Sequence, residues 1–178
     1  MNRQKMTFDE RQERVTKSAG GKVLLLWNER ETEDGGWEYD GAWLETGGAT
    51  DEASLLKAAK KAAEQSIAEW DQSDAVNSFE ANGESVWLDK ATRVGLMNST
   101  GIAKAAGEPG VTLWLGEKSY YTECDKVTEA LSKVEVYAIK CNNATRQHLR
   151  DVEAMTDAES VCGYDYTAGY PEKVEIEI

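Results

Sequence analysis

The chain has little of what metal centres, catalytic sites and disulfide frameworks are built from. Its 178 residues include one histidine, His148, and three cysteines, Cys124, Cys141 and Cys162. An odd number of widely spaced cysteines favours neither a disulfide framework nor a metal knuckle, and it fits a reducing compartment. A single histidine without a cysteine or carboxylate at ligand spacing is more often a hydrogen-bonded core or interface residue than a base. We therefore predict no catalytic residue, no metal, no cofactor and no enzymatic activity.

Positive charge and long apolar runs are also scarce. Against 33 Asp and Glu the chain has 20 Lys and Arg, which gives a net charge of −13 and argues against a nucleic-acid partner. The longest apolar run, Val23–Trp27, is much too short to span a membrane. The segment Met1–Phe8 lacks the apolar region of a signal peptide, so we expect the protein to be made and kept in the cytoplasm.

Two helices are predicted in the first part of the chain. Thr7 and Glu10 form a capping box, which predicts a short helix over Phe8–Ser18. A second helix is expected from Asp51 to Trp70, where apolar residues recur at steps of three and four. We expect this first part, residues 1–72, to form a small helix–hairpin–helix domain.

Between these helices the pattern predicts an antiparallel hairpin. Val23–Trp27 is apolar throughout, which suits a strand that is covered on both faces. Trp37, Tyr39 and Trp43 alternate with polar residues, which places the three aromatic side chains on one side of the second strand. One interpretation is an exposed platform on which sugar rings stack. The other, which we favour, is burial against a helix, because exposed aromatic patches are uncommon in monomers.

The second part of the chain, residues 73–178, shows two hairpins that each run into a helix. Val76–Asp89 turns at Asn82-Gly83, and Val111–Thr122 turns at Gly116-Glu117. A helix over Lys90–Ala106 lies between them. We expect one common core that contains Trp87, Trp114, Leu131 and Val134.

A long apolar seam predicts a helix over Asp125–Met155. It repeats in steps of four and three, with Asn142-Asn143 lowering the helix propensity in the middle, where a kink or a change of packing partner is expected. The later half carries the residues Thr145, His148, Val152 and Met155. Two alternatives remain: this half is a self-association or partner surface, or the segment Tyr164–Ile178 folds back and covers it.

The last residues alternate between apolar and charged side chains and predict a terminal strand. Val174, Ile176 and Ile178 form its apolar face, and we expect it to pair with the N-terminal hairpin or with a neighbouring subunit. The predicted fold is therefore α+β, with two hairpin–helix units, a long C-terminal helix, a small N-terminal unit and a closing strand.

The second part of the chain resembles an uncharacterised domain of tailed phages and prophages, of a type found in gut anaerobes. The resemblance covers about Trp70 to Ile178, and the residues that carry it are Val76–Arg93, Thr112–Gly116, Tyr120–Thr122, Tyr137–Cys141, Thr145, His148 and Tyr164–Lys173. That domain occurs in proteins encoded beside tail-fibre genes. The resemblance implies a tail-fibre-associated or fibre-assembly protein, but it supplies no catalytic residue.

These observations leave two functions in view. The first is a non-enzymatic phage tail protein, either a structural component or an assembly factor, with a tail-fibre or other tail protein or its own copies as partner. Its expected location is the host bacterial cytoplasm or the virion tail. The second is a carbohydrate-binding or glycan-processing module that exposes Trp37, Tyr39 and Trp43. The candidate interaction residues are Trp37, Tyr39, Trp43, Thr145, His148, Val152 and Met155.

Overall fold

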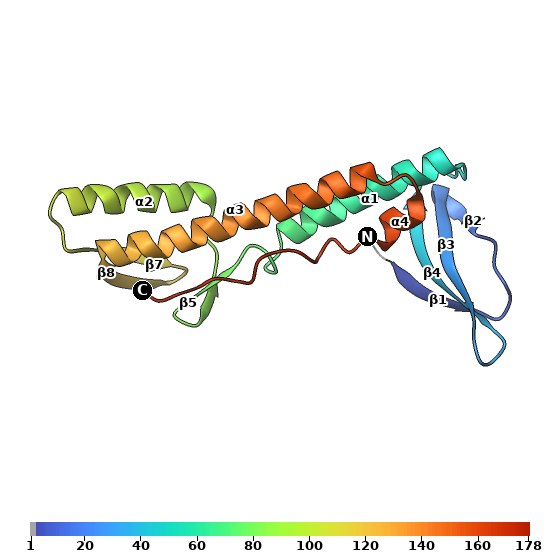
Figure 1. Ribbon diagram of the computed structural model, residues 1–178, viewed down its shortest axis with the longest axis horizontal. Helices are drawn as coiled ribbons and strands as arrows, with labels where there is room; N and C mark the ends of the chain where they lie inside the picture. Colours follow the sequence, from blue (N-terminus) through green and yellow to red (C-terminus); the bar gives the residue numbers. More distant parts are fainter. Residues whose placement is uncertain (1–2) are drawn as a thin grey trace. The chain divides into compact units, whose positions relative to one another are not determined.

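A computed structural model describes residues 3–178 and shows an α+β fold, as predicted (Figure 1). The chain folds into two compact units. The first contains Met1–Glu69 and Arg146–Ala168, and the second contains Trp70–Thr145 and Gly169–Ile178. The sequence predicted a division after residue 72. In the structure the division follows Glu69, and the segment Arg146–Ala168 belongs to the first unit.

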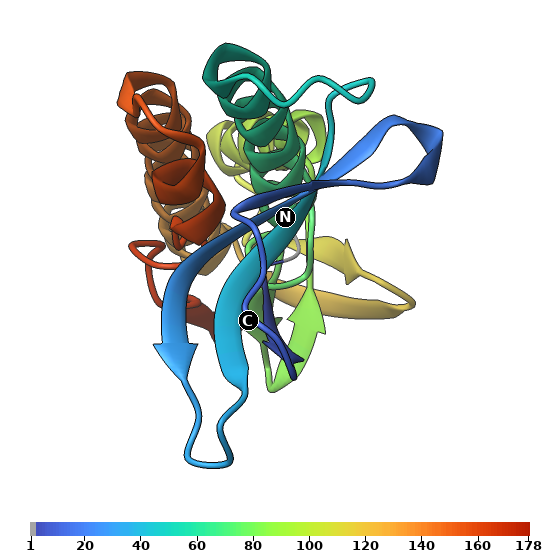
Figure 2. The ribbon, with the colours of Figure 1, turned by 90° about the vertical axis from the view of Figure 1, so that its right-hand side faces the viewer.

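The first unit is built on a four-stranded antiparallel sheet in the order β1-β4-β3-β2. Its elements are β1 (Gln4–Phe8), β2 (Val15–Lys17), the 3-10 turn η1 (Ala19–Gly21), β3 (Lys22–Glu31), β4 (Trp37–Glu45), α1 (Glu52–Asp71, in this unit as far as Glu69), the last turns of α3 and α4 (Ala158–Gly163). Figure 2 shows β3 and β4 side by side as long curved strands. The predicted hairpin is confirmed.

The predicted helix over Phe8–Ser18 is wrong. This segment instead contributes to strands β1 and β2, which pair with the two outer edges of the β3–β4 hairpin. Phe8 lies opposite Trp37, and its ring meets Tyr39 edge-on at 5.9 Å. The capping box is a local signal worth about 1 kcal/mol. The strand pairing with the edges of the β3–β4 hairpin and the packing of Phe8 against Tyr39 outweigh this local signal.

One face of the sheet packs against helices. Four side chains of the hairpin meet the apolar stripe of α1, which has small residues in its middle and therefore allows close approach. The last turns of α3 and helix α4 complete this core. Its buried members are Val23, Leu25, Ala42, Leu44, Leu55, Ala59, Ala63, Ile67, Val152, Ala158, Val161 and Cys162.

The other face of the sheet is covered by the chain that joins β1 to β2. Because these strands lie at opposite edges, the connection must cross β4 and β3. The amide of Gln12 on this connection donates to the Tyr39 hydroxyl at 3.0 Å. A Cβ at Gly41 would lie 2.8 Å from Met6 Sδ and 2.9 Å from Leu26 Cδ2. Glycine at this position therefore lets two side chains from the flanking strands meet over β4.

The second unit contains both predicted hairpins. Its elements are β5 (Phe79–Ala81), β6 (Glu84–Val86), α2 (Lys90–Ala105), β7 (Gly110–Leu115), β8 (Lys118–Glu123), α3 (Cys124–Ala154, in this unit as far as Thr145) and β9 (Glu175–Ile176). Asn82 and Gly83 have φ values of +49° and +79°, as a tight hairpin turn requires. Asp89 caps α2 by accepting from the amide of Thr92.

The terminal strand is present, but its partner differs from both expected ones. β9 pairs in parallel with β5, giving a three-stranded sheet in the order β6-β5-β9. The β7–β8 hairpin forms a separate two-stranded sheet. Ile176 is buried in the core of this unit, which explains the choice of partner: β5 carries Phe79 and Ala81 of the same core.

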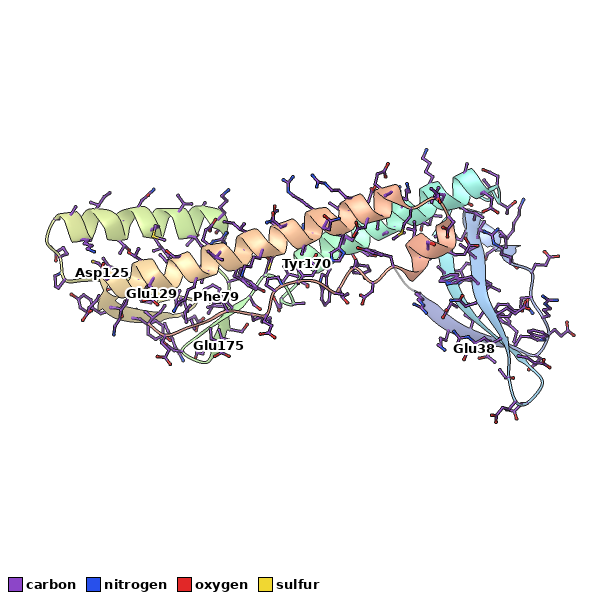
Figure 3. All side chains as sticks on the ribbon, viewed as in Figure 1. Glu38, Phe79, Asp125, Glu129, Tyr170 and Glu175 are labelled. Carbon is purple, nitrogen blue, oxygen red and sulfur yellow. The ribbon has the colours of Figure 1, made fainter. Side chains whose placement is uncertain are left out.

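Helix α3 covers this core, and α2 packs beside it. The ion pairs Arg93–Glu135 and Lys104–Asp125 connect α2 to α3 at two points. The fully or largely buried members of the core are Phe79, Ala81, Leu88, Leu113, Leu115, Val127, Ala130, Leu131, Val134 and Ile176. Figure 3 labels Phe79 on β5 and Asp125 at the start of α3. None of the helices in the described residues is long and apolar enough to cross a membrane.

The predicted core is right for Leu131 and Val134 and wrong for Trp114. Trp87 is half-buried, and its ring lies under the Arg93 guanidinium. Trp114 is 64% exposed. On β7 its neighbours Leu113 and Leu115 point into the core, so strand alternation directs Trp114 outward.

Truncating Phe79 and Trp114 should have very different effects on stability. Phe79→Ala removes a fully buried ring and should lower the free energy of unfolding by about 3 to 5 kcal/mol. Trp114→Ala removes an exposed ring and should lower it by less than about 1 kcal/mol. Urea denaturation followed by circular dichroism measures both. Equal losses would contradict the packing described above.

Candidate interaction surfaces

The three aromatic residues of β4 share one side of the strand, as predicted, but they do not form a platform. Tyr39 is 3% exposed, Trp37 is half-buried and only Trp43 is largely exposed, at 47%. Tyr39 and Trp37 pack with Met6 and Phe8 from β1. The favoured interpretation, burial, therefore holds for Tyr39, although strands and the crossing segment cover it rather than a helix.

A hollow of about 200 Å³ near Tyr39 contains two carboxylates that could suggest hydrolysis, Glu29 and Glu159. Arg11 donates to Glu29, and this bond holds the pKa of the Glu29 carboxyl below its usual value. Glu159 is ion-paired with Arg14. Glycoside hydrolysis needs one carboxyl that stays protonated as a general acid. The hollow offers ion pairs instead.

The candidate residues in the later half of α3 lie in the interior. Val152 is fully buried and Met155 packs beside it in the core of the first unit. Thr145 and His148 are each 8% exposed. Of the two alternatives, the structure shows covering by the chain's own later segment, because α4 and the residues that follow it supply the contacts described next.

His148 stands in a line of hydrogen bonds within the first unit. Its Nε2 lies 2.8 Å from the Ala168 carbonyl, which can only accept, so Nε2 carries a proton. Its Nδ1 lies 2.7 Å from the Tyr164 hydroxyl, which also lies 2.9 Å from Asp151 Oδ2. The Tyr164 hydroxyl donates to Asp151 and contacts Nδ1, so it connects the imidazole ring to the carboxylate.

Thr145 holds a similar position in the second unit. Its hydroxyl donates to Asp71 Oδ1 at 2.6 Å and lies 3.0 Å from the Tyr170 hydroxyl. Since the threonine proton goes to the carboxylate, Tyr170 donates to Thr145. These bonds attach the chain after α4 to the long helix. Both polar groups of the seam thus position the backbone.

The most exposed aromatic side chains of the second unit are not among the predicted interaction residues. Trp114 and Tyr121, 64% and 68% exposed, share the outer face of the β7–β8 hairpin. Thr112 is opposite Tyr121 and Ser119 is opposite Trp114, so the two aromatic residues are diagonal neighbours. Period-two alternation across Leu113-Trp114-Leu115 carries this signal. The bulk of Trp114 favours a core position, but its place between two buried leucines directs it outward.

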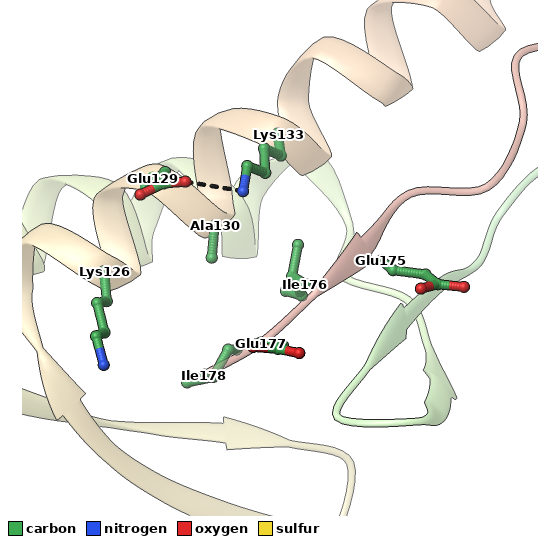
Figure 4. A pocket seen from close by; sticks show the side chains of 8 residues that line it. All are labelled: Lys126, Glu129, Ala130, Lys133, Glu175, Ile176, Glu177 and Ile178. Carbon is green, nitrogen blue, oxygen red and sulfur yellow. Dashed lines mark ion pairs between the residues drawn. The ribbon is translucent and has the colours of Figure 1, made fainter.

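A second surface feature of this unit is a groove of about 560 Å³ between α3 and the end of the chain. Figure 4 shows its lining, with Lys126, Ala130 and Lys133 on α3 and Ile176 and Ile178 opposite. Lys133 is ion-paired with Glu129 on the same helix. The groove therefore combines a few apolar side chains with two lysines and one glutamate on its α3 wall, and Glu175 and Glu177 also border it.

Within residues 3–178, no three His, Cys, Asp or Glu side chains come together as a metal-binding group. The three cysteines are buried free thiols.

Comparison with protein-family models, with curated proteins and with solved structures finds no match for the chain.

Removing the Tyr164 hydroxyl should destabilise the first unit. Tyr164→Phe leaves His148 Nδ1 and Asp151 without their shared partner and should lower the free energy of unfolding by about 1 to 3 kcal/mol. Tyr166→Phe is the matched control, because Tyr166 packs on the same core without a hydrogen bond from its hydroxyl in the described residues. Urea denaturation compares the two variants. A Tyr164→Phe protein as stable as the control would show that the line of bonds contributes little.

The cysteines should be inert in the folded protein. Burial raises the pKa of the Cys141 thiol, and it raises the pKa of Cys162 to about 12. Since the thiolate is the reactive form, Ellman's reagent at pH 8 should leave both unlabelled in native protein. In urea all three cysteines should react. Fast labelling of native Cys162 would contradict this burial.

Proposed function

We propose that the protein is a non-catalytic component or assembly factor of a phage or prophage tail that binds a tail-fibre protein. Two things support this. The second part of the chain resembles a domain encoded beside tail-fibre genes. The outer face of β7–β8 presents Trp114 and Tyr121 to solvent, and this single observation carries the proposal of a binding role.

The physical reason is the cost of exposing such side chains. Tryptophan and tyrosine are the residues most enriched among those that dominate binding energy at protein interfaces, and each can bury 150 to 250 Å². Here the two lie next to each other on a two-stranded sheet, with Ser119 and Thr112 as small neighbours. Tyr121 is supported from below, since its ring lies 3.0 Å from where a Cβ on Gly110 would be. A rigid, flat aromatic surface of this kind suits a protein partner.

Carbohydrate binding is a second candidate, and the same observation favours it. A flat pair of exposed aromatic rings can also stack on sugar rings. The residues concerned are Trp114 and Tyr121, not the β4 aromatics, because Tyr39 is buried.

Co-expression with the tail-fibre protein encoded by an adjacent gene tests the proposal. The parent chain should co-purify with it, and the Trp114→Ser/Tyr121→Ser variant should lose at least nine-tenths of that binding. Trp43→Ser is the matched control, because Trp43 is an exposed tryptophan on the other unit. Mass spectrometry of purified virions then separates a tail component from a factor that departs.

Three outcomes would contradict this proposal. One is a gene position away from tail genes. Another is a double variant that binds the fibre protein as well as the parent. The third is a parent chain that ignores the fibre protein but binds glycans on an array through Trp114, which would favour the second candidate.

A further inference from the structure

Strand β9 leaves one edge of its sheet open. It is the last strand in the order β6-β5-β9, and no strand pairs with its other side in residues 3–178. The carbonyls of Val174 and Ile176 accept from the amides of Glu80 and Asn82, and the Asn82 side chain binds both backbone groups of Ile178. Alternate residues of a strand direct their backbone groups to the same edge. Glu175 and Glu177 therefore direct theirs away from β5.

The groove of about 560 Å³ borders this terminal segment, and its volume is within the usual range for binding pockets. Its apolar lining residues are Ala130 on α3 and Ile176 and Ile178 on the terminal segment. Figure 4 shows Lys126 extending from α3 toward the side of the groove where Ile178 lies. A chain lying here would have backbone partners on one side and apolar contacts beneath it.

Charge on the two faces of the open edge differs in sign. Lys126, Lys133 and Glu129 belong to the α3 side; Glu129 pairs with Lys133, and Lys126, which has no ion-pair partner within the described residues, leaves this side with a net positive charge. Val174, Ile176 and Ile178 pack on the core, so strand alternation places Glu175 and Glu177 on the opposite face of the sheet. An added strand would therefore meet lysines with one set of alternate side chains and glutamates with the other.

We propose that this groove binds an extended segment of a partner protein, which adds to the free edge of β9 as a fourth strand. The segment carries acidic and apolar side chains toward α3 and basic side chains toward Glu175 and Glu177. Backbone hydrogen bonds supply the affinity of strand addition, and alternate side-chain contacts supply its specificity.

The present sheet favours such an addition. β5 and β6 have three residues each and β9 has two, so all three strands are shorter than most strands in globular proteins. A fourth strand would bond to Glu175 and Glu177, which now rely on solvent. The surrounding charges also reject wrong partners, because a segment of uniform charge meets repulsion from one face or the other.

The test is a nuclear magnetic resonance titration of the full chain with the peptide Glu-Lys-Val-Lys-Glu, capped at both ends. Saturable shifts are expected at the amides of Glu175 and Glu177. The control peptide Lys-Glu-Val-Glu-Lys has the same composition with the charges exchanged, and it should bind at least fivefold more weakly. Two further peptides, N-methylated at alternate amides in opposite phases, test the backbone bonds: one should lose binding and the other should keep it.

Protein variants locate the charges. Lys126→Glu/Lys133→Glu should weaken binding at least tenfold, whereas Lys90→Glu/Lys140→Glu changes the net charge of the same unit equally, away from the groove, and should leave binding unchanged. Absence of saturable shifts at millimolar peptide, equal effects of the two double variants, or equal binding of both methylated peptides would overturn the proposal. The outcome is independent of the proposed function, because fibre-protein binding through Trp114 and Tyr121 is measured separately.

Discussion

The apolar seam of α3 is the feature on which both units depend. In the second unit Val127, Leu131 and Val134 cover the small sheets, and Tyr137 with Cys141 closes a smaller cluster. In the first unit the seam continues as Val152 and packs with α1, α4 and the sheet. The two-stranded β7–β8 sheet depends most on this helix, since an isolated two-stranded hairpin is marginally stable at best.

Polar groups along the same seam have a structural task. Thr145 and His148 interrupt the apolar repeat at the point where the chain after α4 must be held. The Thr145 hydroxyl is hydrogen-bonded to the Tyr170 hydroxyl, and His148 is hydrogen-bonded to the Tyr164 hydroxyl and the Ala168 carbonyl. Buried polar groups with several partners fix one arrangement of the backbone, because any other would leave them unsatisfied. This requirement explains why polar residues occur on an apolar stripe.

Both proposed binding surfaces of the second unit lie on small sheets that have open edges. The β7–β8 hairpin has no strand beyond either edge in the described residues, and its outer face carries Trp114 and Tyr121. β9 likewise ends its sheet. Natural proteins usually protect open edges with charge or short length, and Glu175 and Glu177 fit that pattern. A partner strand whose alternate side chains carry the opposite charges would be attracted by the same residues that repel other strands.

Local patterns in the sequence determined the elements whose signal is strong and repeated. The turn at Asn82-Gly83, the strands β3 and β4, α2 with its Asp89 cap and the long helix α3 all follow from period and turn chemistry. Asn142-Asn143 did not interrupt α3, because packing on both sides of them outweighs a propensity of a few tenths of a kcal/mol. The exposure of Trp114 was also present in the sequence, in the alternation with Leu113 and Leu115.

Only the tertiary structure decided which elements meet. The two ends of the segment Phe8–Ser18 belong to strands because β3 and β4 provide edges that are distant in sequence. β9 pairs with β5 rather than with the N-terminal hairpin because Ile176 packs in the core under α3. The burial of Tyr39, Thr145 and His148 depends on residues far along the chain: Gln12, Asp71 and Ala168. Short-range periodicity carries no information about such contacts. The sequence therefore determines the elements and their apolar faces, and the pairing of those faces determines which surfaces remain for a partner.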